Sequence, residues 1–342
     1  MAMIRTKRLE LRKRRGMMIV VGLLTIGLPV LFLGLRLLFH AIDPKSYGPA
    51  GSPGVFQSLI DPTAEFGFII AATVGATLGA TDLSEGVFRQ LVITGRSRVA
   101  LYLARVPAGL TILIPLIAIG FTMNCLVVSF AGTAQPKAVN MNGVSIPLHL
   151  NEHQFETWRA DHPRQVSNAF GGGGFFVRNG KAHPVPATSL SNEYSTYSST
   201  EIAQLNPPIN EMVKIGLWLE LVIATGFLFG LGLGSLTGQR TISTILMIVL
   251  QIIVTPILAA HVIPYFINGQ RLVVGVALTQ LRPAGLAGPF TGNQGGPGHA
   301  IFGGRASLGI PPMPTWAMVA VIVGWIVGWT VIGAWRMQTR DA

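Results

Sequence analysis

The sequence has one cysteine and few charged residues. Only 11% of its 342 residues are Asp, Glu, Lys or Arg, whereas soluble domains carry about a quarter. Cys125 has no second thiol in the chain to pair with, so no intrachain disulfide can form. Acidic residues are fewer than basic ones, 14 against 25, so the net charge is +11. These shortages exclude a disulfide-stapled secreted domain and argue against an ordinary soluble one.

The sequence also lacks a nucleotide-binding loop. No G-x-x-x-x-G-K-[ST] sequence occurs. The glycine-rich "GLGLGSLTGQR" at 230–240 has Gln and Arg where that loop requires Lys and Ser or Thr, and it lies in an apolar run. We therefore predict that this chain is not an enzyme and that it binds no ATP, magnesium or other cofactor itself.

Long apolar runs are what the sequence has instead. Half of the residues are hydrophobic and the mean hydropathy is +0.53. A run of about 20 residues is long enough to cross a hydrocarbon core of roughly 30 Å as a helix. We predict an all-α integral membrane protein in which residues 1–342 form one transmembrane domain with six spans, at about 17–39, 64–80, 100–130, 213–237, 241–264 and 315–335.

The basic residues gather at the ends of these runs. The N-terminal "RTKRLELRKRR" carries seven Lys and Arg before the first span, which is the pattern that keeps a segment in the cytoplasm and attracts anionic lipid. This distribution favours membrane topology over nucleic-acid binding as its explanation. The run from Met17 to Phe39 is too long for a signal-peptide core. We predict a multi-pass protein of the cell inner (plasma) membrane with both termini in the cytoplasm.

This orientation leaves three loops outside, at 40–63, 131–212 and 265–314. The second is polar and contains "GGGG" at 171–174 and "SLSNEYSTYSST" at 189–200, which predicts flexible parts, around or instead of a small folded cap. In the third, the apolar "LVVGVAL" at 272–278 is too short to span and predicts a re-entrant or interfacial helix.

One short segment between the second and third spans differs from both. "TDLSEGVFRQLVITGRSR", Thr81 to Arg98, begins with Asp82 and Glu85 in a capping-box-like spacing and ends near Gly95. Between these limits Leu83, Val87 and Leu91 recur every four residues, and Phe88 and Val92 widen the stripe. The pattern predicts a short amphipathic cytoplasmic helix. It either rests on the inner leaflet or receives a soluble partner.

The same region carries a family resemblance. The stretch "GATLGATDLSEGVFRQLVITGRSRVALYLARVPAGL" from Gly75 to Leu110 is similar to the permease subunits of ABC type-2 exporters. Members show a small-residue span end, an acidic turn, a glycine followed by a hydrophobic stretch, and a Ser-Arg pair that opens the next span. These places are taken here by Asp82, Glu85, Gly86, Leu91, Ser97 and Arg98. The large loop after the third span departs from the members compared, which have a short turn there.

The resemblance implies a function and partners. The 82–98 segment would be a coupling helix seated in a groove of a separate ATP-binding cassette ATPase, which holds ATP and magnesium. A second permease subunit, identical or not, would complete the exporter, with membrane lipid around it and no nucleic acid. The residues that would bind the ATPase are Asp82, Leu83, Glu85, Val87, Phe88, Arg89, Leu91, Arg96 and Arg98.

Further candidate residues lie in the spans. Small residues four apart predict close helix packing, either within the chain or at a dimer face, and they include Gly75, Gly79, Gly226, Gly230, Gly234, Gly324 and Gly328. Glu220 and Asn124 are polar groups inside predicted spans, so they are candidates for the substrate pathway and equally for structural roles. Arg105, near the inner end of the third span, is expected to snorkel to the interface.

A literal metal motif lies in the second outer loop. His149, Glu152 and His153 match H-x-x-E-H, in which two histidines one helical turn apart bind zinc. Pro147 before it and the glycines after it give little helical support, so we expect an ordinary polar loop there. Two alternatives to the exporter remain open. One is a secondary transporter, and the other is a membrane-anchored sensor or zinc hydrolase whose function lies in 131–212.

Overall fold

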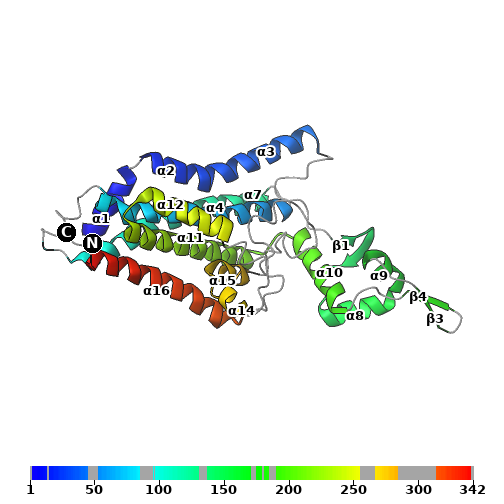
Figure 1. Ribbon diagram of the computed structural model, residues 1–342. Helices are drawn as coiled ribbons and strands as arrows, with labels where there is room; N and C mark the ends of the chain where they lie inside the picture. Colours follow the sequence, from blue (N-terminus) through cyan, green and yellow to red (C-terminus); the bar gives the residue numbers. More distant parts are fainter. Residues whose placement is uncertain are drawn as a thin grey trace.

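The computed structural model describes residues 2–13, 15–44, 53–84, 95, 97–130, 137–170, 175–178, 181–184, 190–254, 266–283 and 313–339. It is predominantly helical: long helices lie side by side in a bundle, and a small mixed α/β unit projects from one end (Figure 1). The N- and C-termini lie together at the other end (Figure 1). Among the described residues, five helices are long and apolar enough to cross a membrane, as expected of a multi-pass membrane protein.

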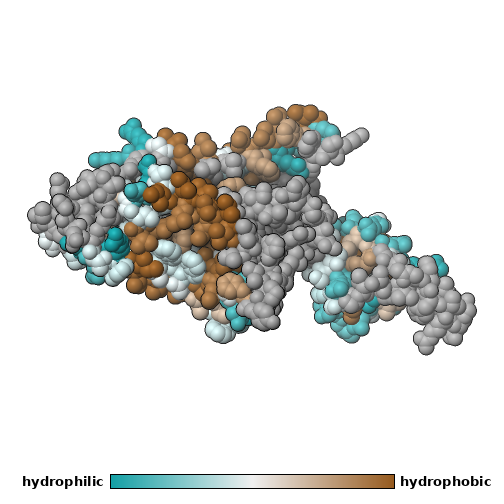
Figure 2. Space-filling view, viewed as in Figure 1, coloured by the Kyte–Doolittle hydropathy of each residue, from teal (hydrophilic) through white to brown (hydrophobic). Residues whose placement is uncertain are grey.

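The first of these five covers Met18–Ile42. It follows the basic helix α1 (Ala2–Lys13) and consists of α2 (Arg15–Gly22), a π-helical turn η1 (Leu23–Gly27) and α3 (Leu28–Ile42). Much of its apolar surface faces outward, for example Leu31, which is 61% exposed. Figure 2 shows apolar residues gathered over the bundle and hydrophilic ones over the projecting unit. An exposed apolar surface of this extent is expected of helices that cross a membrane.

The second helix, α4 (Pro53–Ser84), begins eleven residues before the predicted start at 64. The candidate span within it is Pro62–Thr81, close to the predicted 64–80, so the helix begins in the segment predicted to lie outside the membrane. The early turns are helical because Phe56, Leu59 and Ile60 are buried in the bundle, with Phe56 in edge contact with Phe121 at 6.3 Å between ring centroids. The helix continues through Pro62, which removes one backbone donor but does not end it.

The third helical segment is broken near its start. The short helix α6 (Arg98–Leu103) is followed at Ala104 by α7 (Arg105–Phe130). Pro107 has no N–H to donate to the Leu103 carbonyl four residues earlier, so a continuous helix would lose a hydrogen bond at this point. The two parts together match the predicted 100–130 span.

The fourth helix, α11 (Ile209–Thr237), ends at Gly238. This glycine has φ of +68°, a left-handed conformation that stops the helix at little steric cost. The chain then turns back in α12 (Arg240–Ile248) and a π-helical turn η2 (Val249–Val254). The predicted fifth span, 241–264, is helical as far as Val254, and its remaining residues lie outside the described part of the chain.

The last long helix, α16 (Thr315–Thr339), matches the predicted 315–335 span. Two short helices, α14 (Ile267–Arg271) and α15 (Val274–Gln280), precede it. The Trp218 Nε1–H of α11 donates to the Leu278 carbonyl at 2.9 Å, and the Trp325 Nε1–H of α16 donates to the Leu272 carbonyl at 2.7 Å. The apolar 272–278 stretch is thus largely a short buried helix held by two tryptophans.

The projecting unit lies within the predicted 131–212 loop. It contains the antiparallel hairpin β1 (Ala138–Met141) and β2 (Val144–Pro147), helices α8 (Glu152–Asp161) and α9 (Pro163–Phe170), a second hairpin β3 (Phe175–Arg178) and β4 (Lys181–Pro184), and helix α10 (Leu190–Gln204). Its own apolar core is separate from that of the bundle and centres on Phe155 and Tyr197, whose ring centroids are 5.0 Å apart.

Residues 190–200 of the polar 189–200 stretch are helical and form most of α10, within a small folded unit. Leu190, Tyr194 and Tyr197 recur on one helical face and pack against the core of the unit. The Tyr197 hydroxyl donates to the Pro147 carbonyl at 2.6 Å and accepts from the Leu150 N–H at 3.2 Å. Polar serines and threonines surround these aromatic anchors without preventing the helix.

Candidate functional site: the junction of α4, α6, α7 and α16

Helix α4 ends and helix α6 begins at the end of the bundle that carries both termini (Figure 1). The central part of the connection between them falls outside the described residues, so the structure does not test the predicted helix or six of the predicted contact residues, Glu85, Val87, Phe88, Arg89, Leu91 and Arg96. Asp82 and Leu83 belong to the last turn of α4. Gly95 has φ of +79°, the left-handed conformation that the sequence predicts for a helix stop.

The connection ends at a capped helix start. The Ser97 hydroxyl accepts a hydrogen bond from the Ala100 N–H at 3.2 Å, which satisfies one of the free donors of the first turn of α6. Arg98, the first residue of α6, donates from Nη1 to the Gln338 carbonyl in the last turn of α16 at 3.0 Å. The arginine from the predicted partner surface therefore also joins α6 to the C-terminal end of α16.

One turn further on, α6 packs tightly against α16. The Tyr102 side chain is fully buried. A Cβ atom at Gly333 would overlap its ring and hydroxyl, so α16 approaches this closely only with a glycine there. Arg98 and Tyr102 together attach α6 to the same stretch of α16.

Arg105 connects α7 to α4 at the same level. The side chain is 0% exposed, and its Nη1 donates to the Gly79 carbonyl of α4 at 3.1 Å. The expectation that it snorkels to the interface is wrong, because its side chain is buried in the bundle. One buried arginine thus links the start of α7 to the last turns of α4.

Glycines bring α4 and α11 into backbone contact. A Cβ atom at Gly79 would lie 2.5 Å from the Leu231 carbonyl oxygen, and one at Gly226 would lie 2.6 Å from that of Phe68. Cβ atoms at Gly75, Gly230 and Gly234 would likewise overlap backbone atoms of the facing helix. These five predicted packing residues therefore serve helix packing within the chain.

Gly324 and Gly328 of α16 behave differently. Among the described residues, no atom lies within 4 Å of where their Cβ atoms would be. They line an open apolar groove of about 570 Å³ beside Leu272, Trp325 and Trp329. The small-residue stripe of α16 is therefore not used by the part of the chain that the structure describes.

Glu220 and Asn124 are not brought together. Glu220 of α11 is half-buried, and Lys214 pairs instead with Glu211, at 2.6 Å between Nζ and Oε1. Asn124 of α7 is buried, and within the described chain its Oδ1 has no hydrogen-bond partner. Among the described residues, no hydrogen bond or ion pair joins Glu220 or Asn124 to the junction, and their assignment to a substrate pathway stays a prediction.

The zinc motif does not have the geometry that the pattern requires. Helix α8 begins at Glu152, with Asn151 and Gln154 forming its capping box, and His149 precedes it with φ of +59°. The two histidines therefore do not lie one turn apart on a helix. His149 Nδ1 lies 3.3 Å from Glu201 Oε1, and His153 faces Glu156. Among the described residues no group of three His, Cys, Asp or Glu side chains is placed to hold a metal.

Comparison with known proteins gives no family assignment: no known protein-family model and no curated protein sequence matches the chain.

Proposed function

We propose that this chain is the membrane-spanning permease subunit of an ABC type-2 exporter, with six spans and both termini in the cytoplasm. The observation that carries the proposal is that α4 ends and α6 begins at the end of the bundle where both termini lie, with Arg98 of α6 bonded to the last turn of α16. An ATPase on the cytoplasmic side would meet the α4–α6 connection first. The resemblance of residues 75–110 to such permeases is the second support.

Two hydrogen bonds of the described residues would transmit a movement of the α4–α6 connection to the long helices. Arg98 holds the end of the connection to α16, and Arg105 holds α7 to α4 where the connection begins. Displacement of the connection by a partner is thus passed to three long helices at once. ATP binding by that partner would bias the bundle between inward-open and outward-open arrangements, because a ligand shifts populations by its differential affinity for the two states.

The partners follow from this role. A separate ATP-binding cassette subunit holds ATP and magnesium and performs the hydrolysis, and a second permease subunit completes the substrate pathway. The basic helix α1 lies at the same end of the bundle as the last turn of α4 (Figure 1), where it suits contact with anionic lipid of the inner leaflet.

The test is co-purification of the chain with a candidate ATPase, followed by substitution of Glu85→Ala and Arg89→Ala together. We expect the pair to reduce complex formation or permease-stimulated ATP turnover by about tenfold, a loss of roughly 1.4 kcal/mol, and to leave membrane insertion intact. The matched control is Glu156→Ala with Arg164→Ala, which removes one charge of each sign from exposed positions of the projecting unit. Unchanged assembly and turnover in the first pair would contradict the proposal.

A further inference from the structure

A cavity of about 480 Å³ with both polar and apolar lining opens between α2, α4 and α12, near the end of the bundle that carries the termini. Two arginines contribute to its lining, Arg15 at the start of α2 and Arg240 at the start of α12. The remaining polar lining consists of threonines from α4 and α12, namely Thr73, Thr77, Thr241 and Thr244. Among the described residues, none of those that line the cavity is acidic.

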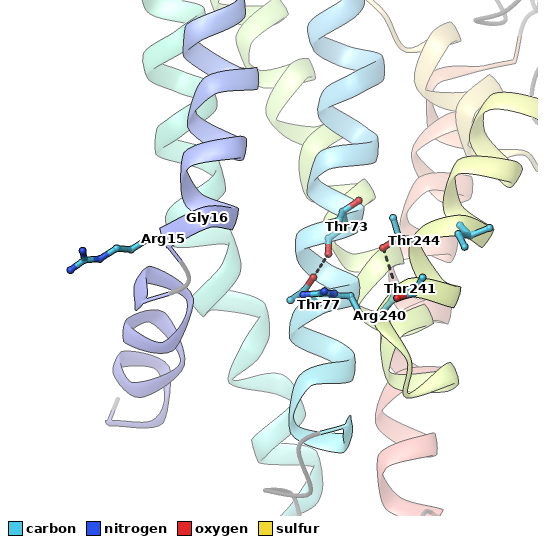
Figure 3. Close-up of a pocket in the computed structure, with 8 residues that line it drawn as sticks. Arg15, Gly16, Thr73, Thr77, Arg240, Thr241 and Thr244 are labelled. Carbon is cyan, nitrogen blue, oxygen red and sulfur yellow. Dashed lines mark hydrogen bonds between the residues drawn. The ribbon is translucent and has the colours of Figure 1, made fainter.

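The two arginines stand differently in the cavity (Figure 3). The Arg240 side chain extends toward α4 near Thr77, whereas the Arg15 side chain points away from the cavity, so that Arg15 lies at its rim. No ion pair to either guanidinium is found within the described chain. An arginine at the edge of a hydrocarbon region with no acidic partner favours an anion as its counter-charge.

Three of the threonine hydroxyls already donate a hydrogen bond within the protein, and each can still accept one from a ligand. Thr73 donates to the Ile69 carbonyl at 2.9 Å, Thr77 to the Thr73 carbonyl at 2.8 Å, and Thr244 to the Arg240 carbonyl at 3.0 Å. Each hydroxyl oxygen still has lone pairs to accept with. The cavity therefore offers a cation together with several acceptors, which fits an anionic group that carries hydroxyl groups of its own.

An apolar surface continues from the cavity along α12. Ile242 and Ile245 are 50% and 56% exposed, Val249 is exposed on the same face, and Ile245 also lines the cavity. From Ile242 to Val254 this surface is about 18 Å long at 1.5 Å per residue, close to the roughly 15 Å of one leaflet's hydrocarbon. A soluble anion would not contact this apolar surface, whereas the acyl chain of a lipid would pack against it.

We propose that this cavity binds the headgroup of an anionic phospholipid, with its phosphate at Arg240, its headgroup hydroxyls at the threonines and an acyl chain along α12. The inference goes beyond the exporter function and needs no ATPase partner. It requires only that α4 and α12 lie in a bilayer with the cavity at headgroup depth.

The test is native mass spectrometry of the full chain in detergent, titrated with phosphatidylglycerol or with phosphatidylcholine of the same acyl chains. We expect one phosphatidylglycerol to be retained at concentrations at which phosphatidylcholine is not. Arg240→Gln removes a charge-assisted hydrogen bond and should weaken this retention by about tenfold. Arg240→Lys keeps the charge but loses the planar guanidinium fork, so it should weaken retention by a smaller factor.

The control is Arg5→Gln, which removes the same charge from an exposed position of α1 at the same end of the bundle. It should change lipid retention by less than about twofold, because salt screens the interaction between an exposed surface charge and a lipid bound elsewhere. Equal effects of the Arg5 and Arg240 substitutions, or equal retention of the two lipids, would overturn the proposal. Displacement of the lipid by an equal concentration of glycerol phosphate would assign the site to a soluble phosphate and overturn the lipid assignment.

Discussion

At the scale of single residues, glycine and arginine decide how the bundle is assembled. Backbone contact between α4 and α11 depends on five glycines, because a Cβ atom at any of them would overlap the facing helix. Such close packing holds the helices together in lipid, where the hydrophobic effect does not drive helices to associate. Arg105 adds a charge-assisted hydrogen bond to the Gly79 carbonyl within this region. At the glycine contacts the two helix backbones are so close that an added Cβ atom would overlap the facing helix.

Gly230→Ala is expected to destabilise the protein. The added Cβ would overlap the Ala72 carbonyl group of α4, and overpacking of this kind costs about 1–3 kcal/mol. The measurement is the thermal unfolding temperature in detergent. Gly34→Ala is the matched control, because no described atom lies within 4 Å of its Cβ position. A Gly230 variant as stable as the Gly34 variant would contradict the observed contact between α4 and α11.

Arg105→Met is expected to loosen the junction. The methionine fills part of the volume but leaves the Gly79 carbonyl without its donor, and hydrogen bonds to charged groups contribute about 1.5–3 kcal/mol. Unfolding in denaturant measures the change. Arg164→Met, at an exposed position of α9, should alter stability by less than about 0.5 kcal/mol. Equal stability of the two variants would show that the buried arginine contributes nothing.

At the scale of elements, Tyr197 is one of the residues that join α10 to the rest of the projecting unit. Tyr197 of α10 joins β2 and the start of α8 through two hydrogen bonds and stacks on Phe155. Tyr197→Phe keeps the ring and removes both bonds. We expect a loss of about 1–3 kcal/mol in local stability, measured as faster hydrogen exchange in α8 and α10. Exchange in α11 should not change, because its core is separate.

The same residue predicts a dependence on alkaline pH. Burial raises the pKa of the Tyr197 hydroxyl, and nearby Glu201 and Tyr194 raise it further against the opposing hydrogen bond at Leu150. Since the folded pKa lies above the ordinary value of about 10, the stabilising contribution is complete below that pH and is lost as the pH rises through the folded pKa. Hydrogen exchange in the unit should therefore rise above about pH 10 more steeply in the wild type than in Tyr197→Phe. Parallel profiles would contradict this account.

The long helices were predictable from sequence, and the projecting unit was not. Five predicted spans coincide with helices that are long and apolar enough to cross a membrane, because hydropathy over about 20 residues is a strong signal. In the unit, the signals are short. The Asn142–Gly143 pair forms the turn of the first hairpin, with φ of +48° and +81°, and Asn-Gly is a known hairpin sequence. The spacing of Leu190, Tyr194 and Tyr197 is also typical of one face of a helix, but the many serines and threonines around them favoured a flexible loop as the prediction.

The junction was predictable only in part. Ser97 and Arg98 stood out in the sequence because they lie beside the amphipathic segment. Arg105 and Gly79 are far apart in sequence, and only the packing of α7 against α4 brings them together. The cavity at Arg240 was missed for the same reason, since three separate helices form its lining.

At the scale of the whole molecule, the two ends of the bundle differ in charge and content. The termini, the basic helix α1, the last turn of α4 and the first turn of α6 lie at one end, and the projecting unit lies at the other (Figure 1). The positive-inside rule predicts that the first end lies in the cytoplasm. The exporter account therefore requires the projecting unit to lie outside the cell.

Cysteine labelling checks this orientation. In a Cys125→Ala background, Ser145→Cys in the unit should react with a membrane-impermeant maleimide on intact cells. Gln338→Cys at the end of α16 should react only after the membrane is permeabilised. Both positions are exposed in the structure, so a failure to react reports the membrane rather than burial. The reverse pattern would place the connection outside and contradict the exporter account.

The most direct test of the central claim is photo-cross-linking in living cells from a reactive amino acid at position 88, with position 145 as the control. The account predicts a cross-linked product between position 88 and a nucleotide-binding subunit, whose yield changes when that subunit is locked in its ATP-bound state, and no such product from position 145. Cross-links from position 88 to lipid alone, with none to protein, would contradict the claim that the α4–α6 connection receives force from an ATPase.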